Sequence, residues 1–350
     1  TQSRSSAASD VYKRQRLMRI ATYNVEWFAS LFDDDNQLYD DGEWSSRYQV
    51  TRAQQTAALG LVFGALDADA VMVIEAPNQG RRQSTVAALK HFAARFALRA
   101  REAVMGFSND TEQEIALLYD PDKLTARHAP LAAADAPRFD QTLRIDLDVD
   151  ATEDAVVFSK PPLELEVTTK AGFAFQMIGA HLKSKAPHGA KSEADVLRIA
   201  IANRRKQLAQ AIWLRRRIDM HLAADRPVMV MGDLNDGPGL DEFESLFGRS
   251  SVEIVLGEGA AALFDPHAKQ ALSRRLGAAP TSARFWIAPE ERYLQALLDY
   301  IMVSPQIRAR DARWRIWHPM DDPTCWQNVA LRDALLAASD HFPVTLDLDI

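Results

Sequence analysis

Residues 228–239 read VMVMGDLNDGPG, an apolar run that ends in a cluster of polar side chains. Consecutive apolar residues such as Val228 to Met231 are typical of a strand buried on both faces. Asp233 and Asn235 follow, two residues apart and therefore on the same side of an extended chain. An Asx-turn would explain this pair, but polar groups at the carboxyl end of a buried strand are also typical of a ligand site.

The same pattern recurs at the ends of other apolar runs. The predicted strands span 18–24, 70–75, 114–119, 163–168, 173–180, 227–232, 298–303 and 344–348. The predicted helices span 46–66, 84–96, 193–224, 241–247 and 331–338. Interleaved strands and helices indicate an α/β layered domain. The polar residues at strand ends are Asn24, Glu26, Glu75, Asn78, His181, Lys183, Ser184, Asp299, Asp340 and His341.

Composition and charge limit the classes of function that are possible for this chain. The chain has 350 residues, of which 47% are hydrophobic and 25% charged, and these values indicate a soluble globular protein. The single cysteine, Cys325, excludes an intrachain disulfide and a cysteine-based metal site. No apolar run approaches the roughly 18 residues of a membrane span, so stable membrane insertion is not expected. A net charge of −7 argues against coating nucleic acid through bulk positive charge.

The charge is unevenly distributed, and the amino terminus is atypical. Residues 31–43 are strongly acidic and residues 203–217 strongly basic, and each segment alone is most simply a solvated surface. Residues 1–17 are polar and patternless, and we predict that they are non-native or disordered, with one domain over 18–350. The localisation therefore stays open between cytoplasm, periplasm and secretion. A monomer is expected.

Four strand-end carboxylates, Glu75, Asp233, Asp299 and Asp340, would meet at one end of such a sheet. Two carboxylates about 4 Å apart repel by roughly 4 kcal/mol at an effective dielectric constant near 20. Such a cluster needs a cation or a bound proton. Oxygen ligands point to Mg²⁺, with Mn²⁺ or Ca²⁺ as alternatives. Histidines beside an oxygen-ligated ion suit cleavage of phosphate esters.

Six segments in order, TYNVEW, IEAPN, AHLKSK, GDLND, LDYI and SDHFPV, resemble the endonuclease/exonuclease/phosphatase superfamily, the group of deoxyribonuclease I. The resemblance spans about residues 18–350, and HLKSK is similar to bacterial members described as nucleases. It implies an α/β fold, a four-layer α/β/β/α sandwich of two packed mixed sheets with the active site at one end. It also implies a metal-dependent phosphoric ester hydrolase.

The resemblance also implies the metal ligands. Glu75 would be the principal ligand, and Asp340 would complete the shell of the ion. Asn24 would hold Glu75 and contact the phosphate, and Glu26 would bind the ion through water.

The catalytic roles follow from the same resemblance. Asp233 would orient or deprotonate the attacking water, and Asn235 would hold that water or a phosphate oxygen. Asp299 would fix the tautomer and charge of His341, which would bind the scissile phosphate. His181 would contact the phosphate and act as general acid.

Further phosphate contacts are expected from Asn24, Asn78, Lys160, Lys183 and Ser184. Two departures from the family pattern concern this region. Lys160 stands where relatives often carry arginine, which grips phosphate with better geometry. Ala76 and Pro77 follow Glu75 where relatives often have a second acid. No catalytic position is lost.

The sequence favours a nucleic-acid substrate, DNA or RNA, but leaves alternatives open. A nuclease needs basic and aromatic groups around its site, and the basic candidates are Lys160, Lys183, Lys185, Lys191, Arg198, Arg204 and Arg205. The acidic segment 31–43 would repel a polyanion if it faced the groove. A lipid or small-molecule phosphodiesterase, or an inositol-phosphate phosphatase, is the second hypothesis, and tryptophans in 314–326 could serve a lipid enzyme. A non-catalytic phosphate-binding module is the remote alternative.

Overall fold

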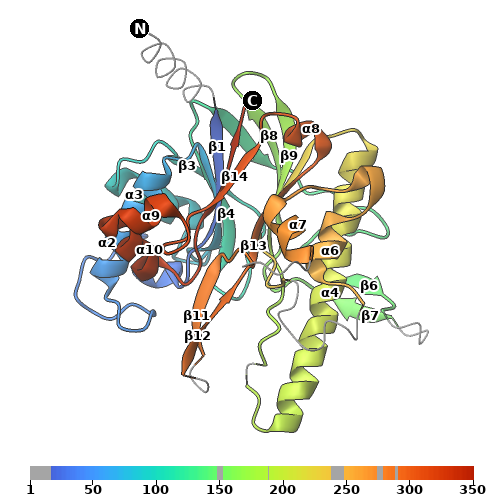
Figure 1. Cartoon of the computed structure of the whole chain (residues 1–350), viewed down its shortest axis with the longest axis horizontal. Coiled ribbons are helices and arrows are strands. Elements are labelled where there is room, and N and C mark those ends of the chain that lie inside the picture. Colours follow the sequence, from blue (N-terminus) through green and yellow to red (C-terminus); the bar gives the residue numbers. More distant parts are fainter. Residues whose placement is uncertain (1–16, 148–152, 188, 238–247, 274–278, 288–290) are drawn as a thin grey trace.

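Two mixed sheets pack face to face in the computed structural model, which describes residues 17–147, 153–187, 189–237, 248–273, 279–287 and 291–350 (Figure 1). The first sheet has the order β14 (Arg313–Ile316), β15 (Val344–Leu348), β1 (Met18–Asn24), β2 (Ala70–Ala76), β4 (Glu114–Tyr119) and β3 (Glu102–Met105). The second has the order β13 (Asp299–Val303), β10 (Val228–Asp233), β9 (Ala174–His181), β8 (Leu163–Thr169) and β5 (Leu124–His128). The pairs β1–β2 and β9–β10 are parallel, and the other neighbours are antiparallel.

Helices cover both outer faces of the paired sheets (Figure 1). The first sheet is covered by α2 (Arg52–Leu66), α3 (Thr85–Arg95), α9 (Pro323–Gln327) and α10 (Val329–Ala338). The second is covered by α4 (Glu193–Ala223), α6 (Ser251–Leu256) and α7 (Pro266–Leu272). The remaining elements are η1 (Phe28–Leu31), η2 (Gly259–Ala261), α8 (Pro305–Arg308), and the strand pairs β6 (Leu143–Ile145) with β7 (Asp154–Val156) and β11 (Ala283–Ile287) with β12 (Arg292–Ala296).

Three apolar cores fill the spaces between the four layers. Alternate residues of each strand enter different cores: Met229 and Met231 of β10 face the first sheet, whereas Val228 and Val230 face α4. This alternation is the period-two geometry of a strand covered on both faces. The expected α/β/β/α sandwich is therefore confirmed.

Several element boundaries differ from those expected from the sequence. The helix predicted over 46–66 begins only at Arg52, because Thr51 is the N-cap and forms a capping box with Gln54. The strands β3, β5, β6, β7, β11, β12 and β14 and the helices α6, α7, α8 and α9 were not expected. The predicted helix 241–247, and residues 1–16 of the segment set aside, lie outside the described residues. In the described part of the chain, no helix combines the length and apolarity of a membrane span.

Candidate active site

Rows of side chains that face the space between the sheets end in polar residues at one end of the sandwich. On β10 the row Met229, Met231 continues to Asp233, and on β1 the row containing Ile20 continues to Asn24. Asn24 Nδ2 donates a hydrogen bond of 3.1 Å to Asp233 Oδ2. Strand parity therefore brings together two residues more than two hundred positions apart. Asn24 was expected to hold Glu75, but its described hydrogen bond is with Asp233.

The GDLND segment is a turn and a site component at once. The Asn235 backbone N–H donates to Asp233 Oδ1 at 2.7 Å, which is the Asx-turn contact. Asn235 Nδ2 donates to Asp233 Oδ2 and to the Leu182 carbonyl, both at 3.1 Å. Asn235 holds a left-handed φ of 50°. Such strain is stored at functional sites more often than elsewhere.

Two histidines face the Asp233 carboxylate from different strands. His181 ends β9, and its Nε2 lies 3.6 Å from Asp233 Oδ2. His341 precedes β15, and its Nε2 lies 3.9 Å from the same oxygen. His341 Nδ1 is 2.8 Å from Asp299 Oδ2, which also accepts a hydrogen bond from Ser282 Oγ. The structure thus joins Asp299 and His341 as the resemblance implied.

The two imidazoles have opposite electrostatic environments. Burial lowers the pKa of His181 well below its ordinary value, and the charges of Lys160 and His341 lower it further. Burial would also lower the pKa of His341, but the carboxylates of Asp299 and Asp233 outweigh it and hold this pKa well above the ordinary value. These environments favour the neutral form of His181 and the cationic form of His341. Burial raises the pKa of Asp233 itself to about 7.

Glu75 reaches the site through a break in its strand. The inward row of β2 is Met72 and Ile74, so simple alternation would turn Glu75 toward the helices. A β-bulge between Ile74 and Ala76, with Glu75 at a left-handed φ of 59°, changes this direction. Glu75 Oε1 lies 3.3 Å from Lys160 Nζ and 4.0 Å from His181 Nε2.

Two polar residues that were not expected hold the acids of the site. Gln113 Nε2 donates to Glu75 Oε2 at 2.6 Å. Arg47 forms an ion pair with Glu26 and also donates to the Leu336 carbonyl. Neither residue has a sequence signal, because both come from irregular segments that only the tertiary fold brings to these carboxylates.

The oxygen atoms here suit a hard divalent cation. Asn24 Oδ1 is buried without a hydrogen-bond partner among the described residues. Burial raises the pKa of Glu26 to about 7, and the charges of Asp340 and Glu75 add to this rise, so the three carboxylates share one region. Within the described ranges, no group of three or more acidic, histidine or cysteine side chains is arranged so that it could hold a metal ion. The donor set nevertheless fits Mg²⁺, because every candidate donor is oxygen.

The remaining phosphate-binding candidates are less closely connected to this centre. Asn78 Nδ2 donates to Gln83 Oε1 at 2.8 Å, and Ser184 Oγ accepts from the Ala186 backbone N–H. Lys160 Nζ lies 3.2 Å from His181 Nδ1, inside the centre. Asn78 and Ser184 therefore stabilise local turns, whereas Lys160 belongs to the site.

The acidic segment 31–43 is partly neutralised by arginines of the outer helical layer. Asp34, Asp40 and Asp41 pair with Arg82, Arg95 and Arg52, respectively. These arginines belong to α2, α3 and the segment before α3. The expected repulsion of a polyanion is therefore reduced.

Several arginines of the basic helix α4 form ion pairs, and two of them are buried inside the protein. Arg204 is buried and lies 2.8 Å from Asp236 Oδ1, Arg217 is buried against Glu164, and Arg205 pairs with Asp154. Lys185 Nζ also contacts Asp236 Oδ1, at 2.7 Å. Arg204 is therefore too deeply buried to be the nucleic-acid contact that was expected, and Lys185 is paired with the same buried carboxylate. Arg205 pairs with a carboxylate at the surface, so its candidacy stays a prediction.

A strand pair that was not expected borders the site. The backbone N–H of Arg284 donates to the Asp340 carbonyl at 2.7 Å, and Ala283 bridges to His341, so β11 starts beside the segment that carries these two residues. The Phe285 ring lies 6.1 Å from the His341 ring. The pair β11–β12 extends beyond the sandwich at the end where β13 begins (Figure 1). Phe285 therefore provides an apolar wall beside His341.

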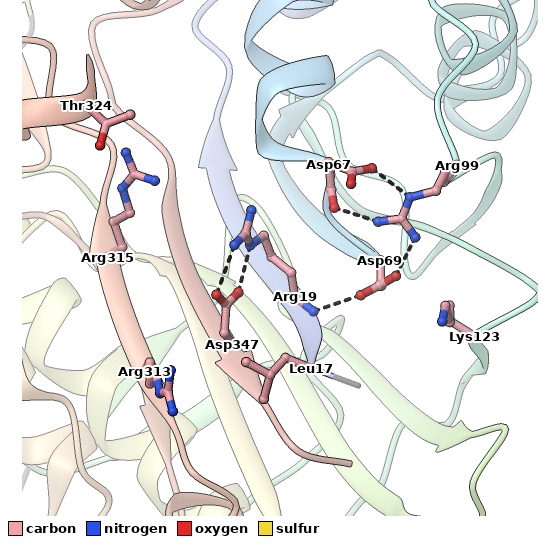
Figure 2. A pocket seen from close by; sticks show the side chains of 10 residues that line it. All are labelled: Leu17, Arg19, Asp67, Asp69, Arg99, Lys123, Arg313, Arg315, Thr324 and Asp347. Atoms are coloured by element: carbon pink, nitrogen blue, oxygen red, sulfur yellow. Dashed lines mark hydrogen bonds and ion pairs between the residues drawn. The ribbon is translucent and has the colours of Figure 1, made fainter. Parts of the chain in front are cut away.

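A cavity of about 810 Å³ lies at the opposite end of β1 and is lined by Leu17, Arg19 and Asp347, among others (Figure 2). Its charges are largely neutralised from within: Arg19 pairs with Asp347, and Arg99 pairs with Asp67 and Asp69. These pairs indicate a structural ion-pair network at the start of the sheet.

The chain is similar to several solved structures. No curated protein matches the chain. Among solved structures, truncated Caenorhabditis elegans TDP2 is 11% identical with a TM-score of 0.49, covering 95% of this chain and 97% of that one. The human Nocturnin catalytic domain with bound sulfate is 14% identical with a TM-score of 0.44, covering 95% and 94%. A Bacteroides thetaiotaomicron endonuclease/exonuclease/phosphatase family protein is 16% identical with a TM-score of 0.48, covering 95% and 97%.

The sequence itself matches the Endonuclease/Exonuclease/phosphatase family over residues 21–341, which includes every residue of the centre described above. The protein therefore belongs to this family, whose members generally hydrolyse phosphoester bonds.

Proposed function

We propose that the protein is a divalent-cation-dependent phosphodiesterase that hydrolyses DNA or RNA. The observation that carries this proposal is the convergence of Asn24, His181, Asp233 and His341 at one end of the sandwich, beside the Lys160–Glu75 pair. This arrangement suits attack of water on phosphorus, because it places acids, an amide, a neutral imidazole and a cationic imidazole around one point.

Asp233 is the group best suited to orient and deprotonate the attacking water. Its Oδ1 is occupied by the Asn235 backbone N–H, and its Oδ2 faces both histidines. The amide groups of Asn24 and Asn235 fix the direction of this carboxylate. A bound Mg²⁺ would polarise the phosphate and stabilise its negative charge, and Glu75, Asp340 and Asn24, with Glu26, would hold it.

His341 would bind the scissile phosphate as a cation. The buried Asp299 carboxylate contacts His341 Nδ1 and stabilises the positive charge of the imidazole. Lys160 adds a second positive charge on the other side of His181. Neutral His181 would donate a hydrogen bond to a phosphate oxygen through Nε2. Its role as general acid stays a prediction, and Lys160 is the nearest group that could supply its proton.

A polynucleotide substrate is supported by the distribution of charge. Carboxylates of the acidic segment are paired with outer arginines, while Lys160 and Lys183 extend positive charge from the centre. Phosphate contacts supply most nonspecific affinity for nucleic acid. A nuclease reaction should therefore slow as salt concentration rises.

A lipid phosphodiester is the second candidate, because exposed aromatic side chains flank Arg47. Trp44 is 68% exposed and Tyr48 is 86% exposed, and Trp27 follows Glu26 directly. Aromatic side chains suit a membrane interface. Of the tryptophans named earlier, Trp317 is buried and Trp314 is partly buried, but Trp326 is 53% exposed.

The test measures hydrolysis of bis-p-nitrophenyl phosphate, plasmid DNA, single-stranded DNA, RNA, sphingomyelin and inositol phosphates with Mg²⁺ and after EDTA. We expect EDTA to abolish turnover and Asn235→Ala to lower kcat without unfolding the protein. Asn328→Ala, which removes a helix cap remote from the centre, is the matched control. Turnover insensitive to EDTA, or none with any cation, would overturn the proposal. Preference for sphingomyelin without a salt effect would select the second candidate.

A further inference from the structure

Two lysines meet where the chain after β9 lies against α4. The Lys183 backbone N–H donates to Gln210 Oε1 at 2.8 Å, and Gln207 Nε2 donates to the Lys183 carbonyl at 2.9 Å. Lys206 precedes Gln207 and lies one helical turn from Gln210. Lys206 is thereby placed beside Lys183.

These two ammonium groups lack the internal partners of the neighbouring cations. Arg204 and Lys185 contact Asp236, and Arg205 contacts Asp154. For Lys183 and Lys206, by contrast, no carboxylate of the described residues lies within ion-pair distance, although both side chains are partly buried. Partly buried cations without a counter-charge are unfavourable. A phosphate of a bound substrate would supply the counter-charge that the described residues do not.

The positive charge of the lysine pair acts on residues of the proposed catalytic centre. Burial lowers the pKa of Lys206, and the charge of Lys183 lowers it further. The charge of Lys183 also contributes to the lowered pKa values of Lys160 and His181. Lys183 follows His181 by two residues, which spans roughly 6–7 Å in an extended chain. This spacing suits the next phosphate of the same strand.

We propose that Lys183 and Lys206 bind the phosphate that flanks the scissile phosphate of a polynucleotide. This inference rests on the proposed phosphodiesterase function and specifies its substrate. It requires a substrate with at least two phosphates in a row, which excludes a simple diester and an isolated phosphomonoester as preferred substrates. Lys206 is a binding residue that the sequence did not reveal, because α4 is basic along much of its length.

The test compares two substrates that differ by one phosphate. The dinucleotide TpT carries only the scissile phosphate, and its phosphorylated forms pTpT and TpTp carry one flanking phosphate on either side. We expect the wild-type protein to cleave one phosphorylated form with a kcat/KM about 10-fold or more above that of TpT, as a charged hydrogen bond provides. In Lys206→Met this preference should disappear, and in Lys206→Arg it should persist.

Arg226→Met is the matched control, since it removes an exposed cation that lies three residues after the end of α4. This variant should keep the preference. A wild-type protein without any preference, or a Lys206→Met variant that retains it, would overturn the inference.

Failure of the proposed function gives a different result. If the protein hydrolyses none of these compounds, binding of fluorescently labelled pTpT and TpTp is measured in EDTA by anisotropy. Weaker binding by Lys206→Met than by Arg226→Met would still support the lysine site. Equal binding would overturn it.

Discussion

Replacing Gln207 by leucine should uncouple the two loops that carry catalytic residues. Gln207 is fully buried, and its Nε2 donates to the Lys183 and Asn235 carbonyls, both at 2.9 Å. Leucine leaves two buried acceptors without this donor. Each such acceptor costs about 1–3 kcal/mol, so we expect the free energy of unfolding to fall by about 2–4 kcal/mol.

The same substitution should also lower activity. A displacement of about 1 Å can cost roughly 100-fold in rate. Gln207 is one of the contacts between the segment after His181 and the Asn235 segment, beside the direct hydrogen bond from Asn235 Nδ2 to the Leu182 carbonyl. We therefore expect kcat for bis-p-nitrophenyl phosphate to fall by about 10- to 100-fold. Urea unfolding monitored by circular dichroism gives the stability, and steady-state kinetics at a temperature where both proteins are folded gives kcat.

Gln210→Leu is the control for this experiment. Gln210 is also buried and loses two hydrogen bonds, to the Lys183 N–H and the Val157 carbonyl, but it does not contact the Asn235 segment. We expect a similar loss of stability with little change in kcat. Equal kcat values in the two variants at matched stability would refute the idea that Gln207 positions Asn235.

Three further results are expected. Glu164→Ala leaves the buried Arg217 cation without its carboxylate and should cost about 3–5 kcal/mol of unfolding free energy in urea titrations; adding Arg217→Met should restore part of it, and no recovery would contradict the pairing. Gly232→Ala should destabilise the protein, because a Cβ would lie 2.1 Å from the Ala180 carbonyl oxygen and φ is +130°; an unchanged melting temperature would contradict this contact. Burial lowers the pKa of His267 from 6.5 to about 4, so this histidine takes up its proton at a higher pH in the unfolded chain than in the folded protein. The free energy of unfolding should therefore fall as the pH drops from 6.5 to 4, by up to about 3 kcal/mol more in the wild type than in His267→Gln. Parallel stability–pH curves of the two proteins would contradict this expectation.

The parts of the fold that the sequence predicted share a strong local signal. The strands β1, β4 and β15 were predicted with the observed boundaries, because their apolar runs are continuous or clearly bounded. The start of α2 was placed too early, although Thr51 and Gln54 carry a capping-box signature that identifies the true start. The strands β11 and β14 were missed because Arg284, Arg313 and Arg315 leave only short apolar runs in these segments.

The residues of the site could be predicted where the alternation of side chains along a strand determines which way they point. Asn24, His181, Asp233 and Asp299 all continue inward rows, so a correct strand assignment brings them together. The direction of the Glu75 side chain depends on a β-bulge for which the sequence gives no local signal. Arg47 and Gln113 depend on the paths of irregular segments, which local propensity does not specify.

The bulge at Glu75 has a consequence for insertions and deletions. Side chains of a strand alternate with period two, so a change of one residue in β2 exchanges its two faces. A single-residue deletion between Ala70 and Ile74 would leave the composition of the centre unchanged while directing its acid toward α2. Relatives that keep all the proposed catalytic residues but lack an odd number of residues in this strand should therefore be inactive.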